Sequence, residues 1–163
     1  MSIKDQFSTE EWGKIMVAPM MAGNAVVTAA PSGPIGMIKE LGSMASTIAK
    51  MTDQPSSNAL VQAVLADIKT AVEQRQQPEL PKLDAKNVEG LKQQALNMVH
   101  EAVGLADAKV EADVAKGYKE FILAIAQKAA EAAKEGGFLG FGGTQVSDAE
   151  QAMLSQLKTT LGL

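Results

Sequence analysis

The side chains best suited to chemistry lie in one stretch, residues 97–111, at the spacing of a helix. Six positions fall within a narrow arc: Asn97, His100, Glu101, Gly104, Asp107 and Glu111. Asp107 and Glu111 repel each other at a four-residue spacing, a cost that a bound cation would relieve. The sequence therefore suggests Asp107, Glu111 and His100 as a divalent-cation site. The arc lacks the Glu-x-x-His spacing of di-iron bundles, however, and a solvated outer face is the interpretation we favour.

A second motif, the glycine-rich stretch 136–143, invites comparison with a phosphate-binding loop. Gly137, Gly142 and Thr144 match three positions of GxxxxGK[ST], but Gly143 stands where lysine must contact phosphate. The stretch also follows a predicted helix rather than a strand. We therefore expect no cofactor here, and interpret the stretch as a helix end anchored by its apolar side chains.

No catalytic residues are predicted. The chain has no cysteine, one histidine and no GxSxG motif, so neither thiol nor serine chemistry has a recognisable centre. The net charge is −4 and Arg75 is the one arginine, which makes a nucleic acid an unexpected partner. These features favour a protein that is not an enzyme.

Length and composition favour a single all-α domain. A chain of 163 residues suits one core, and aromatic residues make up only 4% of it, so small and flexible side chains must fill the interior. The first residues have no basic segment leading into an apolar run, as a signal peptide would. We predict one domain, residues 1–163, a bundle of five or six helices located in the cytoplasm.

The longest helical pattern runs from about residue 87 to residue 134 without a proline. Its apolar positions keep a spacing of three or four residues, which is the stripe of a helix that buries one face. At about 1.5 Å per residue the stretch would be roughly 70 Å long, more than a compact domain of this size accommodates. We therefore expect a break, at Gly104 or preferably at Gly117.

The first helix is predicted from Thr9 to Ala29. Ser8 and Glu11 have the spacing of a capping box, Phe7 and Trp12 that of a hydrophobic staple, and Pro19 is expected to kink the helix. Residues 15–38 carry no charge, which on length alone suggests a membrane span. We reject that interpretation because alanine, glycine and methionine dominate the run and a proline-glycine turn divides it.

The remaining segments complete the predicted bundle. We expect helices over residues 34–51, from Ser56 or Ser57 to about residue 76, and from the capping box of Ser147 and Glu150 to about Leu161. Two prolines mark residues 78–86 as a linker. Residues 136–146 form the glycine-rich loop before the short last helix.

Both ends of the chain resemble a group of small, uncharacterised bacterial helical proteins. The resemblance rests on KEGGFLGFGGTQVSDAEQ, residues 134–151, and on E-E-W…A-P…A-G…P-S-G, residues 10–33. It implies a bacterial, intracellular helical domain and no particular activity.

A more distant similarity is to TerB-like domains of tellurite resistance, in which an acidic Asp-Gly turn precedes a helix that starts at glutamate. Residues 106–110 resemble that turn, and Pro31 to Gly33 with Glu40 resemble it more faintly. Ala108 replaces the glycine and Ser32 the aspartate, which puts the turn and its metal role in doubt. If the similarity holds, the central pattern breaks near Asp107 instead.

Two functions follow from these patterns. The first is a non-enzymatic structural or interaction protein, with stress response as one setting, that binds a protein partner or a second copy through an exposed helical face. The alternative is a metal- or small-ligand-responsive TerB-like domain that uses Asp107, Glu111 and His100 to bind a divalent cation. The first predicts no cofactor, and membrane association is not expected.

Overall fold

The protein is an all-α bundle. The computed structural model describes residues 2–29, 48, 50, 56–74, 87–135 and 146–163. Five α-helices and one short 3-10 helix make up this part of the chain, which contains no strand: η1 (Ile3–Gln6), α1 (Thr9–Ala29), α3 (Ala59–Glu73), α4 (Val88–Lys109), α5 (Ala112–Glu135) and α6 (Asp148–Leu161). The predicted linker, and most of the predicted helix over 34–51 and of the glycine-rich loop, lie outside the described residues.

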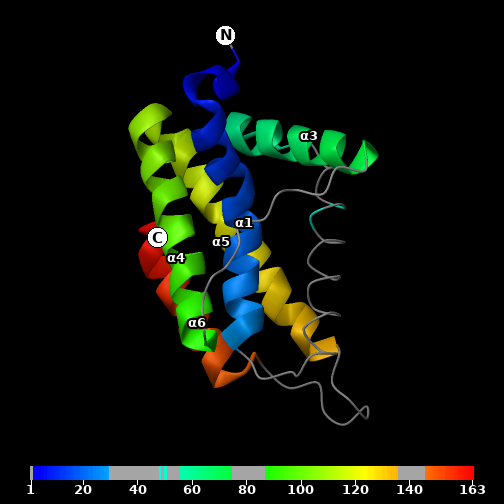
Figure 1. The fold of residues 1–163 in the computed structure, drawn as a ribbon, viewed down its shortest axis with the longest axis vertical. Coiled ribbons are helices and arrows are strands. Elements are labelled where there is room, and N and C mark those ends of the chain that lie inside the picture. The colour runs from blue at the N-terminus through cyan, green and yellow to red at the C-terminus, as the bar shows by residue number, and fades with distance from the viewer. Residues whose placement is uncertain (1, 30–47, 49, 51–55, 75–86, 136–145) are drawn as a thin grey trace.

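Helix α1 lies at the centre of the bundle. It packs against α4, α5 and α6, while α3 crosses the end of the bundle where α1 begins (Figure 1). Eleven of its residues are buried, more than one face of a helix provides, because neighbours cover it from several sides. No helix within the described ranges has both the length and the hydropathy to cross a membrane.

The start of α1 confirms the predicted caps. The Ser8 amide donates to the Glu11 carboxylate at 2.7 Å, and the Glu11 amide donates to the Ser8 hydroxyl at 3.2 Å. The rings of Phe7 and Trp12 pack with their centroids 5.7 Å apart. The capping box of Ser147 and Glu150 likewise opens α6, and Gly162 ends it with a φ of 69°, in the left-handed region.

The central helical pattern breaks earlier than we expected. Helix α4 ends at Lys109, Val110 has extended backbone (φ −123°, ψ 166°), and α5 begins at Ala112. The preferred break at Gly117 is therefore wrong, and both Gly104 and Gly117 lie inside helices. The reversal at residues 110–111 lets α4 and α5 pack antiparallel along α1 (Figure 1).

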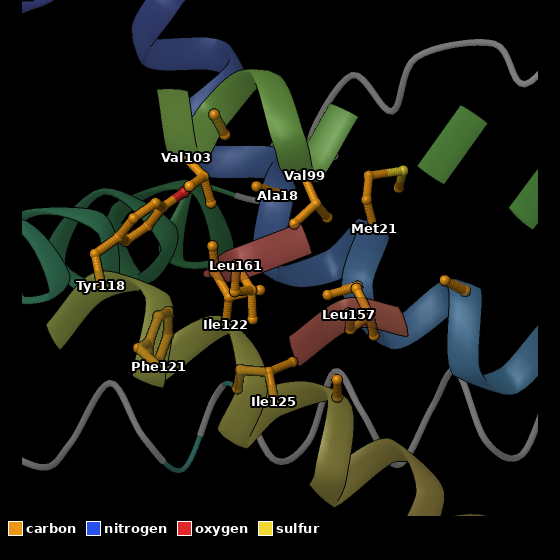
Figure 2. Close-up of a cluster of buried hydrophobic side chains, with 14 of the residues drawn as sticks. Ala18, Met21, Val99, Val103, Tyr118, Phe121, Ile122, Ile125, Leu157 and Leu161 are labelled. Atoms are coloured by element: carbon orange, nitrogen blue, oxygen red, sulfur yellow. The ribbon is translucent and has the colours of Figure 1, made fainter. Parts of the chain in front are cut away.

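Helices α1, α3, α4, α5 and α6 all contribute buried side chains to the core, α3 through Leu60, Val61, Val64 and Leu65. Figure 2 shows one cluster of the core, in which side chains from α1, α4, α5 and α6 meet: Ala18, Met21, Val99, Val103, Tyr118, Phe121, Ile122, Ile125, Leu157 and Leu161. Alanines fill much of the remaining space, as the low aromatic content predicts. Such a core lets the helices approach one another closely.

A buried tyrosine supplies the hydrogen-bond donor that Pro19 cannot provide within α1. Proline has no amide hydrogen, so Pro19 cannot donate to the Ile15 carbonyl four residues earlier. The hydroxyl of Tyr118, on α5, donates to that carbonyl at 2.6 Å. The side chain is fully buried, and its burial raises the pKa of the hydroxyl above the ordinary value. The proline is thus accommodated by a donor from another helix.

The raised pKa of Tyr118 predicts a loss of stability in alkali. Because the folded-state pKa lies above the unfolded value of about 10, the hydroxyl's contribution is complete below pH 10 and falls as the pH rises further. The free energy of unfolding then falls by up to about 1.4 kcal/mol per pH unit. We expect the stability advantage of the wild type over Tyr118→Phe to shrink above pH 10 in urea titrations.

The chain's one tyrosine gives this prediction a direct readout. Tyrosinate absorbance should appear only together with loss of the helical circular-dichroism signal. A tyrosine that titrates near pH 10 while the helices stay intact would contradict it. The Tyr118→Phe variant keeps every lysine, so lysine deprotonation cancels in the comparison.

Candidate functional site

The candidate site lies on the outside of the bundle, along α4. The side chains of Asn97, His100, Glu101 and Asp107 are exposed, as is Gly104. Buried positions of the same helix face the core at the complementary spacing: Ala95, Val99, Ala102, Val103 and Ala106. The structure thus places these five residues on one solvent-facing side of α4.

Two carboxylates of this side are bound by lysines from neighbouring helices. Glu101 pairs with Lys14 of α1 at 3.1 Å, and Asp107 pairs with Lys119 of α5 at 2.7 Å. Hydrogen bonding with Glu101 raises the pKa of the Lys14 ammonium. Exposed pairs of this kind contribute little to stability, because water and salt screen them. They fix α4 against α1 on one flank and against α5 on the other.

Glu111 does not continue the arc. The arc assumes one helix through residue 111, but α4 ends at Lys109 and Glu111 precedes the first residue of α5. Asp107 and Glu111 are therefore not a four-residue pair on a helix, and their predicted repulsion has no geometric basis. Within the described ranges, no three side chains of His, Cys, Asp or Glu gather closely enough to hold a metal ion.

Other polar clusters, not predicted from the sequence, join distant parts of the chain. The Lys109 ammonium contacts the Glu11 carboxylate at 2.7 Å and donates to the Gln6 carbonyl at 3.2 Å. This contact lowers the pKa of the Glu11 carboxyl. The lysine therefore fixes the end of α4 to the start of α1, and Glu11 serves both as capping residue and as ion-pair partner.

A second cluster fixes η1 and α1 to α3. The Asp67 carboxylate accepts hydrogen bonds from Lys4 and from the Trp12 indole, the latter at 2.8 Å. The Lys4 ammonium also lies 5.5 Å from the centre of the Trp12 ring, within range of a cation–π contact. Like the first cluster, it connects helices that are far apart in the sequence.

The amide of Asn58 joins α3 to α5. Its Oδ1 accepts from the Leu60 and Val61 amides at 3.1 and 3.0 Å, so Asn58, rather than Ser56 or Ser57, caps α3. Its Nδ2 donates to the Val114 carbonyl on α5 at 2.9 Å. Gly117 makes room for this amide, because a Cβ at residue 117 would collide with Asn58 Nδ2. The glycine marks a close approach of two helices rather than a break.

One buried carboxylate stands apart from these clusters. Glu150 is only 3% exposed, and its Oε2 accepts from the Ser147 amide and hydroxyl at 2.7 and 2.8 Å. Its Oε1 is buried without a hydrogen-bond partner. The sequence predicted the capping role of Glu150 but gave no indication that the side chain is buried.

Comparison of the chain with protein-family models, with curated proteins and with solved structures gave no match. The resemblances to the small bacterial helical proteins and to TerB-like domains therefore stay predictions. Any function proposed for this chain has to rest on its own residues.

Proposed function

We propose that this chain is a non-catalytic interaction protein whose bundle presents the outer face of α4 to a protein partner. The face consists of exposed residues at helical spacing that carry no carboxylate, ammonium or guanidinium group: Gln93, Asn97, His100, Gly104 and Ala108. We call it the α4 face. Gln93 donates to Asn97 at 3.0 Å, so two of its amides are already ordered along the helix.

The distribution of charge supports this proposal. The nearest carboxylates, Glu101 and Asp107, lie at the margins of the α4 face and are neutralised by Lys14 and Lys119. The centres of protein interfaces are depleted in charged residues, whereas their rims are polar. Gly104 adds room at the centre, since no other helix of the described part of the chain comes within 4 Å of where its Cβ would be. A partner's backbone could approach closely there.

Substitution of Gly104 by arginine tests this proposal. We expect Gly104→Arg to weaken partner binding at least tenfold, which corresponds to about 1.4 kcal/mol, by placing a long charged side chain at the centre of the α4 face. Two measurements apply: sedimentation of the purified protein, for binding to a second copy, and quantitative affinity capture from the cells that make it. Both should be compared with the wild type at equal concentration.

Gly13→Arg is the matched control. Gly13 is also an exposed glycine within a helix, a Cβ there would likewise meet no other helix of the described residues within 4 Å, and it lies on α1 rather than α4. It should behave as the wild type in both measurements. Equal binding by all three proteins would remove the α4 face from the proposal, and absence of any partner or self-association would contradict the interaction role itself.

A thermal unfolding experiment distinguishes this proposal from the metal-responsive alternative. Because Asp107 is already paired with Lys119 and Glu111 lies beyond the helix, we expect the same Tm in EDTA and with each of a series of divalent ions. A site-bound ion at a hundred times its Kd would add about 2.7 kcal/mol, a rise of roughly 5–10 °C. A selective rise that disappears in Asp107→Ala would favour the alternative.

A further inference from the structure

We draw no further inference here: the strongest candidate, the buried Glu150 carboxylate in the first turn of α6, carries nothing because one oxygen belongs to the capping box already described and nothing in the structure shows which donor or cation would meet the other.

Discussion

Replacing Tyr118 by phenylalanine should lower the free energy of unfolding by about 1–3 kcal/mol, although it removes a single oxygen atom. The Ile15 carbonyl would lose its donor in a fully buried place, and Pro19 supplies none in exchange. A buried acceptor without a partner costs more than an average hydrogen bond contributes. Urea titration at neutral pH measures the effect.

A double-mutant cycle with Pro19→Ala identifies the cause. An alanine at residue 19 has an amide hydrogen that can donate to the Ile15 carbonyl, so in that background Tyr118→Phe should cost clearly less, by at least about 1 kcal/mol. Equal costs in both backgrounds would show that Tyr118 stabilises the core only by packing. The comparison holds whether Pro19→Ala by itself raises or lowers the free energy of unfolding.

Two glycine-to-alanine substitutions in helices should change stability in opposite directions. Gly104→Ala should raise the free energy of unfolding by about 0.5–1 kcal/mol, because alanine favours helix and its methyl group meets open space. Gly117→Ala should lower it by about 1–3 kcal/mol, since the methyl group would overlap the Asn58 amide. Chemical denaturation of the two variants side by side provides the measurement.

Removal of the Asn58 amide should reverse the effect at Gly117. Asn58→Ala alone should cost about 0.5–2 kcal/mol, because α3 loses its cap. In that background the methyl group at residue 117 has room, and Gly117→Ala should become neutral or stabilising. If Gly117→Ala is equally harmful with and without Asn58, the close approach of the two helices is not its cause.

Local signals in the sequence predicted the fold class and several helix ends. Ser8 with Glu11, and Ser147 with Glu150, form their capping boxes within three residues, so the sequence pattern contains the whole interaction. Helix propensity placed the break of the central pattern at Gly117, whereas the similarity to TerB-like domains placed it near Asp107, closer to the observed turn at residues 110–111. Whether a glycine breaks a helix or admits a neighbour depends on what packs against it, and Asn58 is far away along the chain.

The candidate site, too, could be predicted from the sequence only in part. Helical spacing correctly placed five residues on one exposed face, because that inference needs only a continuous helix: Asn97, His100, Glu101, Gly104 and Asp107. It failed for Glu111, which lies past the end of α4. The lysines that bind Glu101 and Asp107 come from α1 and α5, and no spacing within residues 97–111 could reveal them.

The central position of α1 also affects how the chain is made. Ribosomes produce α1 before the helices that bury most of it, which come from residues 88–161. At about 5–20 residues per second the nascent chain holds an apolar helix without its cover for roughly 10 s. During that time the Ile15 carbonyl also lacks the Tyr118 hydroxyl. Native packing of α1 therefore has to wait until α4, α5 and α6 have been made, and chaperones that bind exposed apolar segments have an opportunity to bind α1 before then.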